Sequence, residues 1–282
     1  MTAPTGSNAV TIPSGLVALT THGFVRSETL KCIIDMRSHS EQQGLTNARW
    51  EFVPGSLVDK ARNDAVRMML RDGHGWLLFV DADMTFSADA ALNLIRSAYA
   101  EVPQADVMGA YCSLRGDWAL PTIDTGTGTW ESHFPGSGIL SVMRTGAAFL
   151  LVKRHVFERM KDPWFAMRVP MRPIDALAEV DNFARIKCDG RNPFREGTDH
   201  WWERLEKCAA EDPSAAQENF TPAEVGEDSG FCDRAKLMGF NIFVNTNVVC
   251  GHIDTKVIDW TTHKKSIDDA AKTSRYCVGM TA

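Results

Sequence analysis

The sequence lacks long hydrophobic runs and closely spaced cysteines. Its longest apolar stretches, residues 76–80 and 147–152, fall far short of the ~20 residues that a transmembrane helix requires. No two of the seven cysteines follow the C-x-x-C spacing of zinc or redox sites, and the first residues lack the basic and apolar segments of a signal peptide. We therefore expect a reduced, cytoplasmic protein without a membrane span.

An excess of basic charge is also missing. The 282 residues include 30 Lys and Arg against 36 Asp and Glu, which gives a formal net charge of -6. The field of the whole protein would repel a polyanion, so nucleic acid could bind only through a local basic patch. An acidic substrate would need explicit help, such as a metal ion.

The composition is that of a globular protein that can bury a core, with 44% hydrophobic and 23% charged residues. Short apolar runs predict strands, and amphipathic segments between them predict helices. Strands and helices alternate up to residue 111, which favours βαβ units and a mostly parallel α/β sheet. The predicted strands are residues 15–20, 49–53, 76–80, 106–111, 139–143, 148–152 and 241–249, and the predicted helices are 56–73, 87–99, 155–160 and 227–239.

Serine residues precede two of the predicted helices. Ser56 and Asp59 have the spacing of a capping box, and Ser87 is placed to cap the helix that follows it. A polar segment without a clean period is interpreted as an insertion or lid. The expected organisation is a flexible leader at 1–14, a domain at 15–255 with the insertion at 162–222, and a C-terminal tail at 256–282.

Two carboxylates follow the most apolar predicted strand. In open α/β sheets, ligands bind at the carboxyl ends of strands, so Asp81 and Asp83 are expected at such a site. Two carboxylates there can hold a hard divalent cation against a phosphate group. The alternative is that one of them caps the next helix, but Ser87 already stands in that position. We therefore predict a metal site at Asp81 and Asp83.

Other residues have both a structural and a functional interpretation. His252 follows a strand and a glycine, where a neutral imidazole could be a metal ligand or an ordinary buried histidine. Glu227 and Asp228 open a predicted helix, where they could favour the helix dipole or act as a general base. Arg62 and Asn63 lie in the middle of a helix, on a solvated face or against a nucleotide.

Taken in order, the motifs of this chain resemble a GT-A-fold glycosyltransferase, and most of all the compact, soluble bacterial or phage members. The resemblance covers roughly residues 15–255 and leaves the 162–222 insertion unmatched. It implies a Rossmann-like, mostly parallel central sheet flanked by helices, with a C-terminal insertion or lid. The motifs that carry it are Thr20-Thr21-His22, Ala61-Arg62-Asn63-Asp64, Leu78-Phe79-Val80-Asp81-Ala82-Asp83, Gly146-Ala147-Ala148, residues 226–235 and Gly251-His252.

The resemblance also implies ligands and residue roles. The donor would be a UDP- or GDP-linked sugar and the cofactor Mn2+ or Mg2+, while the acceptor could be a protein, a glycan, a small molecule or a modified nucleobase. Asp228 would be the general base of an inverting enzyme, with Glu227 as its substitute. The implied metal ligands are Asp83, Asp81 and His252, and the implied nucleotide-sugar contacts are Thr20, Thr21, His22, Arg62, Asn63, Asp81 and Ala82.

Two other functions remain open at this point. The run from Leu77 to Thr85 also resembles the first motif of haloacid-dehalogenase-type phosphatases, in which Asp81 would be the nucleophile and Asp83 the general acid. A non-catalytic module that binds a nucleotide or glycan is the other alternative, with Trp201 and Trp202 as stacking platforms.

Overall fold

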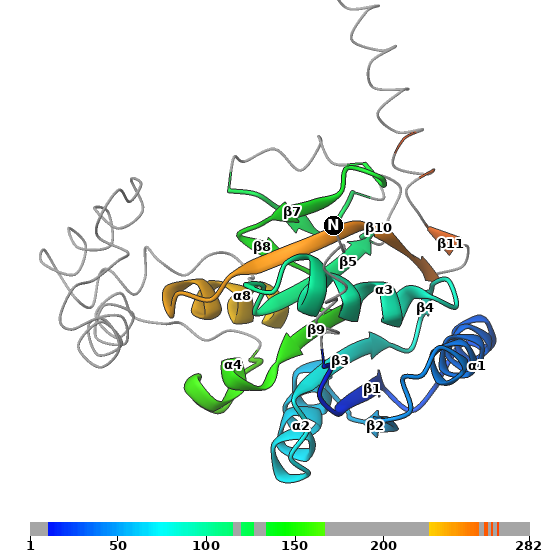
Figure 1. The fold of residues 1–282 in the computed structure, drawn as a ribbon, viewed down its shortest axis with the longest axis horizontal. Helices are drawn as coiled ribbons and strands as arrows, with labels where there is room; N and C mark the ends of the chain where they lie inside the picture. Colours follow the sequence, from blue (N-terminus) through cyan, green and yellow to red (C-terminus); the bar gives the residue numbers. More distant parts are fainter. Residues whose placement is uncertain are drawn as a thin grey trace, which may run out of the picture.

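The fold is a mixed α/β arrangement with helices on both faces of a nine-stranded sheet (Figure 1). A computed structural model describes residues 11–114, 120–126, 134–166, 226–253, 257–258, 261 and 264. Most of the predicted leader, most of the predicted tail, most of the 162–222 insertion, and Trp201 and Trp202 therefore lie outside the described residues. No helix in the described part is long and apolar enough to span a bilayer.

The strands of the large sheet follow the order β11-β10-β5-β9-β3-β1-β2, with β4 and β7 paired to β10. A second, two-stranded sheet consists of β6 and β8. The strands are β1 (Gly15–Thr21), β2 (Ala48–Pro54), β3 (Trp76–Asp81), β4 (Met84–Thr85), β5 (Val107–Cys112), β6 (Ile123–Asp124), β7 (Ile139–Ser141), β8 (Arg144–Thr145), β9 (Phe149–Lys153), β10 (Ile242–Ile253) and β11 (Val257–Ile258).

The long strands share one direction, with a single reversal. β1 is parallel to β2 and β3, and β10 is parallel to β5. β9 lies between β3 and β5 and is antiparallel to both, so β3 and β5 also point the same way. The prediction of a mostly parallel central sheet is confirmed. Its consequence is that the carboxyl ends of β1, β3, β5 and β10 meet at one edge, where ligands bind in open α/β sheets.

The helices are α1 (Ser27–Gln42), α2 (Val58–Arg71), α3 (Ala90–Arg96), the π-helical turn η1 (Ser97–Glu101), α4 (Arg154–Arg159) and α8 (Glu227–Leu237). The predicted strands and helices are each present, with boundaries that differ by a few residues. α1 was not predicted, because its buried face carries Thr29 and Ser40 as well as Ile33 and Met36. Two polar residues among four hide the apolar period that identifies an amphipathic helix.

Both predicted serine caps are wrong. Helix α2 begins one residue later than a Ser56 cap requires, with Leu57 as the N-cap residue and no side-chain cap bond. Helix α3 begins at Ala90, and the Ser87 hydroxyl donates instead to the Asp89 carboxylate at 2.5 Å. The first turns of both helices therefore lack the capping bonds that the spacing suggests.

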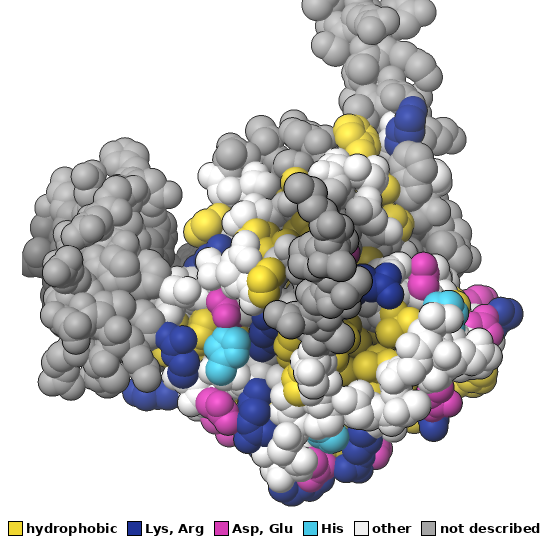
Figure 2. All heavy atoms as spheres, viewed as in Figure 1, with side chains coloured by type: hydrophobic (Ala, Val, Ile, Leu, Met, Phe, Trp, Pro, Cys, Tyr) yellow, Lys and Arg dark blue, Asp and Glu magenta, His cyan; other side chains and the backbone are white. Residues whose placement is uncertain are grey.

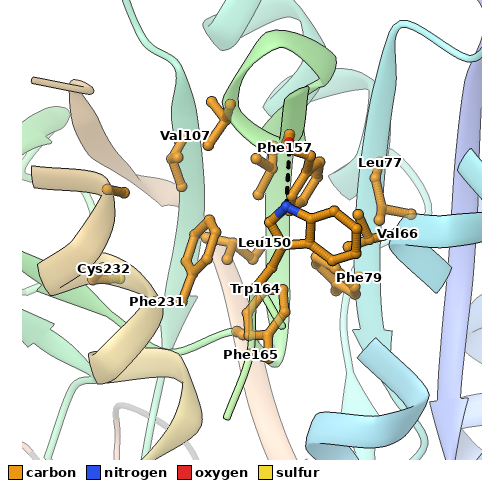
Figure 3. Packing of buried hydrophobic residues seen from close by; sticks show 14 of the residues in the cluster. Val66, Leu77, Phe79, Val107, Leu150, Phe157, Trp164, Phe165, Phe231 and Cys232 are labelled. Atoms are coloured by element: carbon orange, nitrogen blue, oxygen red, sulfur yellow. Dashed lines mark hydrogen bonds between the residues drawn. The ribbon is translucent and has the colours of Figure 1, made fainter. Parts of the chain in front are cut away.

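Each face of the sheet buries its own apolar cluster. The face covered by α2, α4 and α8 packs aromatic rings edge to face, such as Phe79 against Phe165 with centroids 5.1 Å apart (Figure 3). The Trp164 indole donates to the Phe157 carbonyl at 2.9 Å and closes this layer. The opposite face, covered by α1 and α3, packs around Met36 and Leu94.

Charges of both signs intermix along the lower margin in Figure 2, so the described residues form no continuous basic patch there.

The start of β1 depends on a glycine. A Cβ atom built on Gly15 would lie 1.9 Å from the Trp76 ring, which is held by a bond from its indole to the Pro13 carbonyl. We expect Gly15→Ala to lower the free energy of unfolding by about 1–3 kcal/mol through overpacking. Urea unfolding followed by tryptophan fluorescence measures the change. Gly230→Ala is the control, because a Cβ there meets only an ordinary contact at 3.9 Å and the helix gains propensity. Equal stability of the two variants would contradict this account of β1.

Candidate active site

A pocket of about 180 Å3 opens at the edge where the parallel strands end. Its walls come from the ends of β1 and β3, from the loop after β1 and from the start of α2. The lining includes Thr20, Thr21, His22, Asp81, Ala82 and Asp83. The structure therefore brings together, in one concave site, five residues that the sequence resemblance assigns to the nucleotide-sugar and one, Asp83, that it assigns to the metal.

Asp81 is held by the protein itself. The Thr20 hydroxyl donates to Asp81 Oδ1 at 2.6 Å, and Arg62 Nη2 donates to both carboxylate oxygens at 3.1 and 2.9 Å. Charge-assisted bonds of this kind fix a carboxylate and neutralise it. Asp81 thus lines the pocket with its side chain fixed in position, and both of its oxygens already accept hydrogen bonds.

Arg62 joins the end of β3 to the start of α8. Its side chain is only 3% exposed, and Nη1 donates to the Glu227 carboxylate while Nη2 binds Asp81. Its guanidinium also lies 5.9 Å from the centre of the Phe165 ring. A buried guanidinium between two carboxylates satisfies the rule that buried charges are paired. In this conformation Arg62 faces the protein and not a nucleotide phosphate.

Asn63 also faces the protein. Its amide nitrogen donates to the Phe165 carbonyl at 2.6 Å, and its amide oxygen accepts the Phe165 N–H at 3.0 Å. These two bonds satisfy the buried N–H and C=O groups of Phe165, which in a sheet would be bonded to a neighbouring strand. In this conformation the Asn63 amide holds the backbone of Phe165 and is not directed at a nucleotide base.

The loop after β1 is shaped by Thr21. Its hydroxyl donates to the Phe24 carbonyl at 2.7 Å and accepts the Gly23 N–H at 3.1 Å. Gly23 takes a φ of 105°, a left-handed conformation that favours glycine. The Arg26 N–H then donates to the Ala82 carbonyl at 3.1 Å, which ties this loop to the segment between the two aspartates.

Asp83 and His252 are brought together by the backbone. β4 pairs antiparallel with the end of β10, Met84 lies opposite His252, and the Ile253 N–H donates to the Asp83 carbonyl at 2.7 Å. As a result, His252 Nε2 lies 4.0 Å from Asp83 Oδ1. The sequence alone did not predict β4, yet it is the element that sets this distance.

The hydrogen bond of Nδ1 determines the tautomer of the neutral His252 ring. Nδ1 lies 2.5 Å from the Ser113 carbonyl oxygen, which can only accept, so Nδ1 carries the hydrogen. In the neutral ring the lone pair is then on Nε2, on the side of Asp83. A histidine that donates to a backbone carbonyl through one nitrogen is a common arrangement for a metal ligand.

The chemistry of Asp83 and His252 suits a divalent ion. Within the ranges that the structure describes, no group of three or more His, Cys, Asp or Glu side chains is placed to hold a metal. Asp81 is engaged by Thr20 and Arg62 in this conformation, so its part in a metal site with Asp83 and His252 stays a prediction. The residues present therefore offer one carboxylate and one imidazole, and a hard cation would take its other ligands from phosphate oxygens and water.

Helix α8 carries the candidate base in its first turn and is bound by Arg144 near its middle. Asp228 Oδ1 accepts the Ser229 N–H at 2.7 Å, in the first turn. Farther along, Asp233 is bound by Arg144 Nε at 2.6 Å and by Nη2 at 3.0 Å. Burial raises the pKa of the Asp233 carboxyl, and the Arg144 guanidinium opposes that rise. The pairing of Arg144 with Asp233 was not predicted, because partners 89 positions apart have no signal in one sequence.

No family model and no curated protein matches the chain. Among solved structures it is similar to A197 from STIV, with 16% identity, a TM-score of 0.46, and coverage of 87% of this chain and 93% of that one. GalNAc-T7, solved with UDP, GalNAc and Mn2+, is 9% identical with a TM-score of 0.43, covering 86% of this chain and 44% of that chain. A glycosyltransferase involved in glycosylation of the major capsid of PBCV-1 is 12% identical with a TM-score of 0.33, covering 54% and 70%.

Proposed function

We propose that this chain is a metal-dependent glycosyltransferase that moves a sugar from a nucleotide-sugar donor to an acceptor hydroxyl. The observation that carries the proposal is the placement of Asp83 and His252 4.0 Å apart at the carboxyl edge of the sheet, next to a pocket lined by the end of β1. A cation held by this pair would face the phosphates of a nucleotide in the pocket.

The roles of the site residues follow from their contacts. Thr20, Thr21, His22 and Ala82 line the pocket and would contact the nucleotide. Asp83 and His252 would hold Mn2+ or Mg2+. Arg62 and Asn63 are assigned to positioning instead, Arg62 through Asp81 and Glu227, and Asn63 through Phe165.

Transfer breaks the bond between the sugar C1 and the diphosphate oxygen. When bound, a divalent ion supplies the electrophile that stabilises the charge on the departing diphosphate. The acceptor oxygen attacks C1 as it gains oxocarbenium character, and its proton passes to a carboxylate of this chain. The protein's part is to orient donor and acceptor and to accept that proton.

Asp228 is the better candidate for the base. Glu227 is already engaged in an ion pair with Arg62, and its side chain is 12% exposed. Asp228 lies in the first turn of α8 and uses Oδ1 for the Ser229 N–H. This difference supports Asp228 as the proton acceptor and Glu227 as part of the scaffold.

The phosphatase alternative is not favoured. A nucleophilic Asp81 needs an oxygen directed at phosphorus, but Thr20 and Arg62 bond to both of its oxygens. In that family the nucleophile also ends the first strand, whereas β3 follows β1, α1, β2 and α2.

Incubation of the full chain with a panel of UDP- and GDP-sugars, Mn2+ and candidate acceptors tests the function. Mass spectrometry should detect the mass of one sugar on an acceptor, with release of the nucleoside diphosphate. Phosphate release from a simple phosphate ester without any nucleotide-sugar would decide for the phosphatase. Tight donor binding in calorimetry without turnover on any acceptor would decide for the binding module.

A histidine variant tests the metal pair. We expect His252→Ala to raise the Mn2+ concentration for half-maximal activity roughly tenfold or more, because one of two protein ligands is lost. The measurement is a metal titration of donor turnover, with thermal unfolding to confirm the fold. His39→Ala on α1 is the matched control, since His39 lies in the last turn of that helix and outside the pocket. A titration curve unchanged by His252→Ala would leave His252 as a structural residue.

A further inference from the structure

The edge of the sheet formed by β2 is open. β2 is the outermost strand on its side, it pairs with β1 alone, and no strand among the described residues covers its outer edge (Figure 1). Proteins usually protect such an edge with lysine, proline, a bulge or a covering element, because it is a template for pairing with another chain. In β2 proline appears only at the last position, Pro54.

The direction of the outward backbone groups follows from the bonds to β1. The Asn47 carbonyl accepts the Gly15 N–H at 3.3 Å, and the Gly55 N–H donates to the Thr21 carbonyl at 2.9 Å. In a parallel ladder every second residue bonds to the same neighbour, so the odd-numbered residues face β1. The N–H and C=O groups of Ala48, Trp50 and Phe52 therefore point outward, and Pro54 ends this row.

An apolar patch flanks the open edge. Phe52 is 53% exposed, and on the neighbouring helix α1 Ile34 is 59% and Leu30 is 41% exposed. With Trp50 these side chains line a groove of about 190 Å3 between α1 and β2. Trp50 and Phe52 share this face because they stand opposite Val17 and Leu19 of β1, which pack on the α1 side. Arg49 and Glu51 lie on the other face.

We propose that β2 pairs antiparallel with β2 of a second copy of this chain, centred on Trp50, and so joins two sheets into one. In this register Trp50 stands opposite Trp50 of the partner subunit, and Ala48 and Phe52 exchange main-chain hydrogen bonds with the partner's Phe52 and the partner's Ala48. Phe52 is then covered instead of exposed.

Charge favours a second copy over another extended partner. In this register Arg49 stands directly opposite Glu51 of the partner subunit, and the two-fold axis repeats the contact. Within one chain, Arg49 Nε and Nη2 bond to Glu51 Oε1 at 2.8 and 2.6 Å, and Arg49 Nη1 bonds to Asp72 at 2.6 Å. The Arg49 side chain is exposed and that of Glu51 is partly exposed, so both can reach a partner. A different protein would need the same alternation of opposite charges, and this chain supplies it to itself.

Sedimentation equilibrium of the full chain over a range of concentrations tests the proposal. The unmodified protein should dimerise reversibly. Arg49→Glu and Glu51→Arg each set like charges opposite one another across the axis, so each variant alone should raise the dimer dissociation constant roughly tenfold or more. An equimolar mixture of the two variants should recover dimers, because a heterodimer restores opposite charges at both contacts.

The controls separate pairing from folding. Lys31→Glu makes a similar charge change on the exposed part of α1, does not line the groove, and should leave the dissociation constant unchanged. Thermal unfolding of Arg49→Glu and Glu51→Arg should stay cooperative. A chain that stays monomeric at every concentration overturns the proposal and leaves the edge to an extended peptide of another protein. A mixture that dissociates as readily as the single variants overturns the register.

Discussion

Replacing Asp83 with alanine should abolish sugar transfer and weaken donor binding in the presence of Mn2+. Asp83 Oδ1 lies 4.0 Å from His252 Nε2, and the Asp83 side chain is 21% exposed at the pocket. Without it, a bound cation would lose its proposed anionic ligand, and the diphosphate would lose the positive charge that offsets its own. Calorimetry with UDP and a nucleotide-sugar, with and without Mn2+, measures the loss of affinity alongside the turnover assay.

Asp35→Ala is the control for this experiment. Asp35 is a carboxylate on α1 that pairs with Lys31 in solvent, so its removal changes charge without touching the pocket. Both variants should unfold near the temperature of the unmodified chain. Sugar transfer that persists in Asp83→Ala and also in the presence of EDTA would remove the metal from the mechanism.

Asp228→Asn should lower kcat by about 10²–10⁴-fold with little change in donor affinity. The amide keeps the shape of the side chain and an oxygen that can accept the Ser229 N–H, but it cannot take up a proton. A general base acts mainly in the transition state, so the loss should appear in kcat and not in the binding of the donor. Steady-state kinetics and calorimetry together separate the two.

Glu227→Gln should cost less activity than Asp228→Asn, although it weakens the ion pair with Arg62 and so lowers stability. The anomeric configuration of the product, read by NMR, adds an independent result. Retention of the donor configuration together with a small effect of Asp228→Asn would exclude Asp228 as a base. Unfolding of Asp228→Asn would assign the residue to the helix terminus instead.

The parallel strands were predictable from sequence because each carries its own signal. β3 is an unbroken apolar run, and β1 and β10 end in polar motifs, so their common edge followed from strand direction alone. The lining of the pocket by Thr20, Asp81 and Asp83 could be anticipated on the same basis. The local sequence pattern was enough to place a side chain wherever its position depended only on the strand that carries it.

The partners of the helical residues were not predictable. A charged residue in mid-helix suggests a solvated face or a ligand contact. Arg62 is instead buried between two carboxylates, those of Asp81 and Glu227, which lie 19 and 165 positions away in the sequence. Asn63 is likewise bound to a backbone 102 positions away. Long-range polar pairs leave no period or spacing to detect. The same holds for β4, a strand of two residues that determines the distance between Asp83 and His252.

The contacts around helix α8 bring two distant parts of the chain together. Arg234 donates to the carbonyls of Pro163 and Lys161 at 2.5 and 2.8 Å, and a Cβ on Gly230 would touch the Ala166 carbonyl oxygen at 3.9 Å. The points where the chain leaves the sheet after α4 and returns to it at α8 are thus adjacent. The entropy of closing a loop grows only slowly with its length. Because the described ends of the chain at Ala166 and at α8 lie side by side, joining them costs an entropy that depends little on how much sequence lies between them.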